Sequence, residues 1–148
     1  MPGLKKVIHR LNKKGLPLGI ISNAQFYTPV ILNYFLTKRY TEEDEVSNFK
    51  PDLTVFSYKK LISKPDESLF REIVPVLEKK YNIRPDEVLY VGNDMLKDIL
   101  PASKVGFMTA LFAGDKRSYR IRSDVAEVKN LKSDYTITEL GQIIKIVS

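Results

Sequence analysis

The sequence predicts an α/β protein, a mostly parallel Rossmann-like sheet in three layers with helices on both faces. Two observations carry this prediction. Short apolar stretches typical of buried strands alternate along the whole chain with stretches that have the apolar period of a helix. In addition, polar residues stand directly after several predicted strands. Alternating strands and helices build parallel sheets, and such sheets hold their ligands at the carboxyl ends of the strands.

Length and composition fit a single domain over residues 1–148. The chain is 43% hydrophobic, which is enough for a core. No apolar run approaches the roughly 20 residues that cross a bilayer, and the first residues lack the apolar stretch of a secretory leader. We therefore expect no membrane association and a cytoplasmic location. The absence of cysteine excludes disulfides and thiolate metal sites.

The first part of the chain is expected to hold two helices and two strands. In order, these are a helix from Leu4 that Gly15 ends, a strand over 16–22, a helix opening at Thr28–Pro29, a mixed-charge surface segment over 37–52 and a strand over 53–58. The second helix carries its apolar side on Val30, Ile31, Tyr34 and Phe35.

The second part continues the alternation. A helix with Pro65 in its first turn is expected to run to Tyr81, although Pro75 inside it should bend it or cost about 3 kcal/mol. The remaining expected elements are a strand over 88–93, a helix from about Asp94 to Lys104 that Gly106 ends, a strand over 107–114, a short strand over 134–137 and a terminal helix over 140–147.

Two polar features near the predicted strand ends are candidates for binding an anion. Ser22 and Asn23 end the first strand, and their side chains can donate hydrogen bonds to an anion, although turn chemistry alone would also explain them. Lys64 stands just before a helix and can place an ammonium near a phosphate. A surface lysine with a solvated head is the alternative interpretation.

A third feature is acidic. Asn93, Asp94 and Asp98 follow the third strand, and the two aspartates are spaced so that one helical turn brings them together. Like charges at that spacing destabilise a helix unless something positive compensates them, and Mg²⁺ with oxygen ligands would do so. The alternative is that Asp94 caps the helix while Asp98 pairs with a nearby lysine.

In this order and context the three features resemble the haloacid dehalogenase-like (HAD) superfamily. GIISNA, residues 19–24, is similar to its second motif, a strand ending in Ser or Thr. SKPD, residues 63–66, is similar to its third motif, and YVGNDMLKDI, residues 90–99, to its fourth. The resemblance covers essentially the whole chain.

The resemblance implies a phosphohydrolase that works through an aspartyl-phosphate on a small phosphorylated metabolite. Ser22, with Asn23, would hydrogen-bond the phosphoryl oxygens, and Lys64 would neutralise charge on the nucleophile and the phosphoryl group. The fourth motif, Asn93 with Asp94 and Asp98, would hold Mg²⁺ or position its waters. Phosphoryl transfer depends mostly on such positioning and charge stabilisation.

The chain departs from the family at two points. The residue after Gly92 is commonly Asp, whereas here it is Asn93 and the carboxylate moves to Asp94. The family's first motif, a strand ending in Asp-x-Asp that supplies the nucleophile, has no counterpart in this sequence. We therefore expect the chain to be part of a longer protein and inactive alone. A missing N-terminal segment, or a second chain, would complete the sheet.

Two other functions stay open at this point. The chain could be a non-catalytic remnant that binds phosphate or a partner, or a dehalogenase, although Lys64 and the acidic turn favour phosphate. The net charge of +6 and the basic stretch KRSYRIR, residues 116–122, are compatible with nucleic acid. The lysines are otherwise scattered, so we favour a solvated surface over a nucleic-acid partner.

Overall fold

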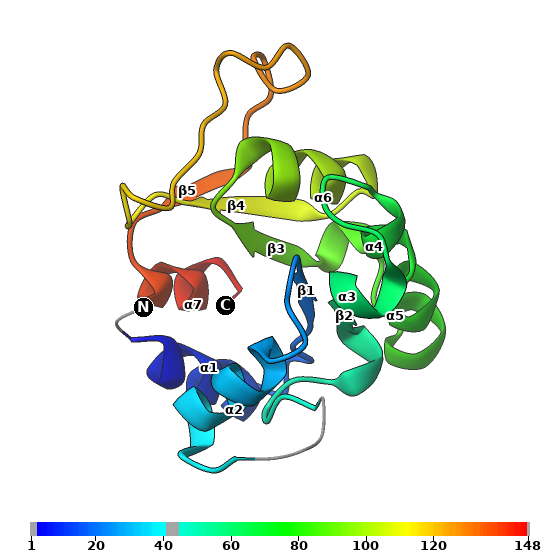
Figure 1. The fold of residues 1–148 in the computed structure, drawn as a ribbon, viewed down its shortest axis with the longest axis vertical. Coiled ribbons are helices and arrows are strands. Elements are labelled where there is room, and N and C mark those ends of the chain that lie inside the picture. The colour runs from blue at the N-terminus through cyan, green and yellow to red at the C-terminus, as the bar shows by residue number, and fades with distance from the viewer. Residues whose placement is uncertain (1–2, 41–44, 148) are drawn as a thin grey trace. The chain divides into compact units, whose positions relative to one another are not determined.

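The computed structural model describes residues 3–40 and 45–147 and divides into two compact units, residues 1–63 and 64–148 (Figure 1). Every strand pair that the structure describes is parallel. Within residues 3–40 and 45–147, no helix is long and apolar enough to cross a membrane. The predicted α/β class with parallel pairing is therefore confirmed, and each unit is described in turn.

The first unit pairs two short strands beside its helices. Its elements are α1 (Leu4–Lys13), β1 (Ile20–Ser22), α2 (Thr28–Thr37), the 3₁₀ turn η1 (Pro51–Leu53), β2 (Thr54–Phe56) and α3 (Ser57–Lys60). Strand β1 runs parallel to β2, with Ser22 opposite Phe56. Phe56 belongs to a buried cluster with Ala24 and Val46. Because Ala24 lies just past Ser22, this cluster anchors the segment that follows β1.

The predicted apolar side of α2 is wrong. Ile31, Tyr34 and Phe35 are exposed, while the buried residues of this helix are Pro29 and Asn33. Burial of the asparagine has a clear reason, because its side-chain oxygen accepts a hydrogen bond from the Ser47 N–H at 3.1 Å. That contact ties the helix to the segment that the sequence marked only as a surface excursion.

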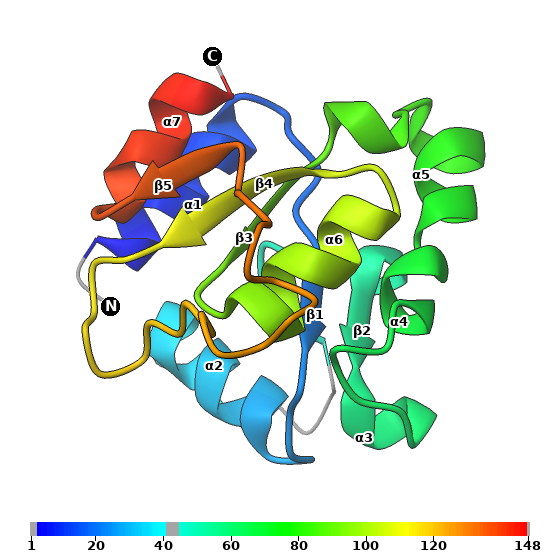
Figure 2. The same ribbon diagram turned by 90° about the horizontal axis from the view of Figure 1, so that it is seen from above.

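The second unit contains a three-stranded parallel sheet in the order β3–β4–β5. Its elements are α4 (Ser68–Arg71), α5 (Val74–Tyr81), the 3₁₀ turn η2 (Pro85–Glu87), β3 (Leu89–Gly92), the π-helical turn η3 (Met95–Ile99), α6 (Leu100–Lys104), β4 (Met108–Phe112), β5 (Tyr135–Ile137), the 3₁₀ turn η4 (Leu140–Gln142) and α7 (Ile143–Ile146). Helices α6 and α7 lie on opposite faces of this sheet (Figures 1 and 2), which gives the expected three layers within this unit.

A buried cluster supports the turn that follows β3. Met95 and Ile99 of η3 pack with Leu111 of β4 and with Val128, which comes from the long connection between β4 and β5. Because Met95 and Ile99 anchor η3 in the core, the polar residues between and before them are held at the carboxyl end of β3.

The helix predicted from Pro65 to Tyr81 is broken in two, which corrects the prediction at both prolines. Pro65 precedes the first helix, which starts at Ser68, and Pro75 stands at the start of α5. A proline in the first turn costs nothing, since its missing N–H would have no partner in the helix there. The cost that we expected for a proline inside a helix therefore does not arise.

Candidate functional site

The acidic turn, residues 93–98, joins β3 to α6 and buries both of its aspartates. Asp94 and Asp98 are 7% and 5% exposed. Asp94 caps η3, and its Oδ1 accepts hydrogen bonds from the N–H groups of Leu96 at 3.0 Å and Lys97 at 3.1 Å. Since a buried carboxylate is stable only when it is paired and hydrogen-bonded, the partners of both aspartates define this site.

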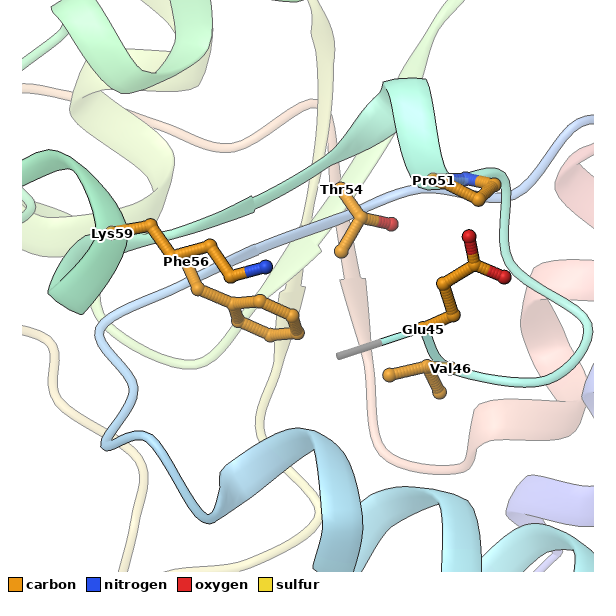
Figure 3. A pocket seen from close by; sticks show the side chains of 6 residues that line it. All are labelled: Glu45, Val46, Pro51, Thr54, Phe56 and Lys59. Atoms are coloured by element: carbon orange, nitrogen blue, oxygen red, sulfur yellow. The ribbon is translucent and has the colours of Figure 1, made fainter. Parts of the chain in front are cut away.

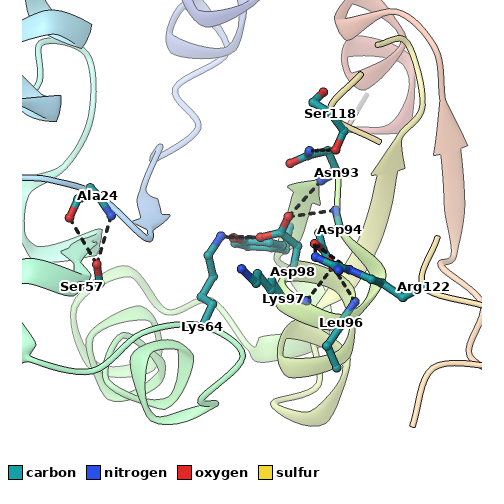
Figure 4. Close-up of polar contacts among 11 residues, drawn as sticks. Ala24, Ser57, Lys64, Asn93, Asp94, Leu96, Lys97, Asp98, Ser118 and Arg122 are labelled. Atoms are coloured by element: carbon teal, nitrogen blue, oxygen red, sulfur yellow. Dashed lines mark hydrogen bonds and ion pairs between the residues drawn. The ribbon is translucent and has the colours of Figure 1, made fainter. Parts of the chain in front are cut away.

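Asp98 receives donors on both of its oxygens (Figure 4). Its Oδ2 accepts from the backbone N–H groups of Asn93 at 3.0 Å and Asp94 at 3.1 Å. Its Oδ1 forms an ion pair with the Lys64 ammonium and accepts from the Tyr90 hydroxyl at 3.3 Å. The Asp98 carboxylate therefore ties the end of β3, its own turn and the lysine into one buried cluster.

Tyr90 is the neutral member of this cluster. Its hydroxyl accepts a hydrogen bond from the Lys64 ammonium at 3.2 Å, and its ring packs edge-on against the fully buried Phe70. Burial raises the pKa of Tyr90 well above its ordinary value, and the nearby Asp98 carboxylate raises it further. The hydroxyl consequently keeps its proton and acts as a donor to Asp98 while helping to fix Lys64.

Asp94 has a cationic partner of its own. Arg122 donates to it through Nε, at 3.3 Å from Oδ1 and 3.2 Å from Oδ2, and through Nη2 at 2.7 Å from Oδ2. Burial raises the pKa of Asp94, but the hydrogen bonds from Arg122 and from the Lys97 and Leu96 N–H groups outweigh it, and the net pKa is lowered. Asp94 is therefore held as a carboxylate.

The segment over residues 115–122, here called the strap, carries Arg122 to the acidic turn. The Arg120 N–H donates to the Asn93 carbonyl at 2.9 Å, and the Met95 N–H donates to the Arg120 carbonyl at 2.9 Å. The Asn93 side-chain amide donates to the Ser118 carbonyl. Backbone and side-chain contacts thus fix the strap along the residues that follow β3.

Gly92 makes room for this arrangement. A Cβ at this position would lie 2.3 Å from the Asp98 Cβ and 2.6 Å from its Cγ. Such distances are far inside van der Waals contact, so a side chain at residue 92 would push Asp98 away from the N–H groups it accepts. The glycine before Asn93 is therefore a packing requirement of the buried carboxylate.

Ser22 and Asn23 lie in the other unit. Ser22 ends β1 and is half-buried, and Asn23 is exposed. The loop after them is held by the Ser57 hydroxyl, which accepts from the Ala24 N–H at 3.1 Å and donates to its carbonyl at 3.4 Å. The structure thus brings together Lys64, Asn93, Asp94 and Asp98, and the convergence of Ser22 and Asn23 with them stays a prediction.

A cavity of about 190 Å³ also lies in the first unit (Figure 3). The residues that line it are Glu45, Val46, Pro51, Thr54, Phe56 and Lys59. No predicted site residue is among them. We therefore keep the acidic turn, with its buried charges, as the candidate site.

The acidic turn does not fit a self-sufficient magnesium centre. Within the described residues, no three histidine or carboxylate side chains gather as a metal-ligand group. The two carboxylates present are already neutralised, Asp98 by Lys64 and Asp94 by Arg122. The compensation that the sequence led us to expect from Mg²⁺ is supplied here by two side chains. The alternative interpretation of the two aspartates describes the observed contacts, because Asp94 caps η3 and Asp98 pairs with Lys64.

The parallel α/β units and the lysine–aspartate pair at a strand end are features that the resemblance to HAD proteins leads us to expect. The comparisons with known proteins confirm this resemblance, although no protein-family model matches the chain. Glyceraldehyde 3-phosphate phosphatase from Pyrococcus furiosus is 28% identical over 149 residues, covering 99% of this chain and 54% of the relative. The phosphatase of the same name from Methanocaldococcus jannaschii is 26% identical over 164 residues, covering 97% and 69%. The chain spans about half the length of the first of these relatives.

Solved structures share the fold over the whole chain. A HAD phosphatase from Thermococcus onnurineus has a TM-score of 0.70 and 21% identity, and the match covers 100% of this chain and 58% of that one. A HAD hydrolase from Bacillus subtilis, solved with bound magnesium, has a TM-score of 0.73 and 18% identity, covering 100% and 56%. The chain therefore shares the fold of these HAD proteins, and its sequence is similar to glyceraldehyde 3-phosphate phosphatases.

Sequence reasoning missed two members of the site. The sequence did not point to Tyr90, because a tyrosine in an apolar strand gives no sign that its hydroxyl meets a charge. Arg122 was counted in an exposed basic loop, because its partner Asp94 lies far earlier in the chain and no periodicity links them.

Proposed function

We propose that this chain contributes the phosphate-binding part of a HAD-type phosphohydrolase, which cleaves a small phosphorylated metabolite. The observation that carries the proposal is the buried cluster of Lys64, Tyr90 and Asp98 at the carboxyl end of β3. It is supported by the two sequence relatives, both named as phosphatases of a phosphorylated aldehyde. We propose a phosphomonoester of this size as the substrate class.

Each predicted residue has a role in the proposal. Lys64 is held in place by Asp98 and would meet the charge of the phosphoryl group, since an ammonium acts on phosphate as a point charge. Ser22 and Asn23 would donate hydrogen bonds to the phosphoryl oxygens from the end of β1. Convergence of these groups on one anion remains the central assumption of the proposal.

The covalent step needs a nucleophile that this sequence does not contain in the expected context. We propose that a further segment, or a second chain, supplies an Asp-x-Asp strand end, because the chain spans about half the length of its first relatives. Mg²⁺ dependence belongs to that assembled protein. There Asn93 would join the supplied carboxylates as a ligand and Asp98 would position waters of the cation, which would neutralise phosphoryl charge.

A non-catalytic role is the second candidate, and one observation favours it. Both carboxylates of the acidic turn are already saturated by donors within this chain. Such a cluster can be a purely structural support for a protein that binds phosphate or a partner without hydrolysis. A dehalogenase activity rests only on structural neighbours of the same fold, whereas the sequence relatives named for an activity are phosphatases.

The test combines binding with turnover. We expect the 148-residue chain to bind inorganic phosphate in a ³¹P NMR titration and to release none from glyceraldehyde 3-phosphate, with or without Mg²⁺. Lys64→Gln should weaken phosphate binding at least about tenfold, since it removes the central charge. The exposed Lys60→Gln variant is the matched control. Turnover by the chain alone, or equal binding by both variants, would contradict the proposal.

A further inference from the structure

The acidic turn places two carboxylates one helical turn apart, and the protein supplies a separate cation for each. Lys64 pairs with Asp98, and Arg122 pairs with Asp94 through two guanidinium nitrogens. The two cations come from segments on either side of the turn in the sequence. The chain therefore neutralises the turn without any bound ion.

The oxygens of Asp94 are fully occupied. Oδ1 accepts from the N–H groups of Leu96 and Lys97 and from Arg122 Nε, and Oδ2 accepts from Arg122 Nε and Nη2. A carboxylate offers about four lone-pair directions, so these donors leave no direction for a cation. A metal ion could bind Asp94 only after Arg122 had withdrawn.

Arg122 is not placed to withdraw easily, because the strap that carries it is fixed. Three contacts hold the strap to the acidic turn, through Arg120 in both directions along the backbone and through the Ser118 carbonyl. The Arg122 side chain is only 33% exposed, although it lies at the protein surface. By contrast, Arg117 in the same strap is 95% exposed.

We propose that Arg122 is a positioning residue that holds Asp94 as the cap of η3 and keeps its carboxylate out of divalent-cation binding. The strap thereby decides which groups at the end of β3 can meet a cation, and Asp94 is not one of them. The use of this device in catalysis rests on the proposed phosphohydrolase function. The cation-binding behaviour does not, and it can be measured without turnover.

The test measures Mg²⁺ binding to the whole chain by isothermal titration calorimetry at low ionic strength. Arg122→Gln releases the Asp94 carboxylate, and the variant should bind Mg²⁺ about fivefold or more tightly than the native chain, the size expected for removing one partly screened cation. Arg122→Lys keeps a positive charge beside Asp94 and should restore native-like binding. A purely structural role would leave the affinity unchanged or lower it.

Two further variants separate this device from a general charge effect. Arg117→Gln removes the same charge from the exposed part of the strap and should leave the affinity within about twofold of the native value. Asp94→Ser keeps a good helix cap but removes the carboxylate. It should change nothing in the native background and should abolish the gain in the Arg122→Gln background.

The proposal is overturned if Arg122→Gln binds Mg²⁺ no more tightly than Arg117→Gln. It is also overturned if Asp94→Ser alone weakens Mg²⁺ binding, because Asp94 would then be a ligand in the native chain. Far-UV circular dichroism checks that each variant is folded. If Arg122→Gln does not fold, the Asp94→Ser measurement alone decides. Phosphatase activity enters none of these readouts, so failure of the proposed function would be seen separately.

Discussion

The strand ends of the two units are held by different chemistry. After β3, the chain is fixed by two buried carboxylates, a lysine, an arginine and the backbone of the strap. After β1, the corresponding segment makes contacts with neutral hydroxyls, those of Ser57 and Thr28, and passes directly into exposed Phe26 and Tyr27. Both ends follow a short parallel strand, so the difference lies in the groups that hold the segment after the strand and not in the strand pairing.

The difference shows that only one of the two predicted halves of the site is built in advance by this chain. Groups fixed by several charged hydrogen bonds lose little freedom when a ligand arrives, which favours binding. Asn23 is exposed and lies outside the charged cluster. We therefore expect substitutions after β3 to act on stability and binding together, and substitutions after β1 to have smaller effects on stability.

The largest expected effect is that of Asp98→Ala. The substitution leaves Lys64 and two backbone N–H groups without their shared acceptor, and breaking a buried ion pair costs about 3–5 kcal/mol. Urea unfolding should show this loss, with the exposed Glu127→Ala as the control that stays near the native value. A loss below about 1 kcal/mol would mean that the charged cluster does not hold the end of β3.

Gly92→Ala comes next. The added methyl group would meet the Asp98 Cβ at 2.3 Å, and overpacking of this kind costs about 1–3 kcal/mol. Gly141→Ala is a matched control, because nothing lies within 4 Å of the added atom there. Equal stability of the two variants by denaturant unfolding would show that the acidic turn adjusts freely, contrary to the contrast drawn between the units.

Acid should remove part of the stability of the second unit. The pKa of Asp94 is lowered in the folded chain, so its contribution is present above the unfolded carboxyl pKa of about 4 and is lost as the pH falls through the folded value. Asp94→Asn removes the charge but keeps a capping side chain. The difference in free energy of unfolding between the native chain and this variant should shrink as the pH falls below about 5. Denaturant unfolding at each pH measures this difference. A difference that grows on acidification would refute this assignment.

The smallest expected effect is in the first unit. Ser57→Ala removes the hydroxyl that bridges both backbone groups of Ala24, which should cost about 0.5–1.5 kcal/mol. Ser63→Ala, at an exposed position, provides the comparison. A loss as large as that of Asp98→Ala would erase the distinction between the two strand ends.

The order of strands and helices could be predicted from the sequence because apolar runs and glycines mark it directly. Lys64 and Asp98 could also be proposed as site residues from the sequence. Each lies at a predicted strand end or helix start, within a segment that resembles a HAD motif. The exposure of the apolar side of α2 was not predicted. The spacing of apolar residues shows that a helix has an apolar face, but it does not show whether another element covers that face. Pro75 was placed inside one long helix because the apolar residues keep the same helical period across α4 and α5, which are separate helices.

The charged partners were harder to predict for a physical reason. Arg122 meets Asp94 only because a long connection between two strands returns along the end of β3. A periodic pattern reports on neighbours within one element, and it carries no information on such a return. Within the described residues the two carboxylates are compensated by Lys64 and Arg122, and Mg²⁺ binding stays a prediction.

The glycine at residue 92 also has an evolutionary consequence. A larger residue there could be accepted only if residue 98 became smaller, and a smaller residue 98 would abandon the lysine at position 64. These three positions should therefore vary as a set. A related sequence that has lost the glycine should therefore have lost the acid and the base as well.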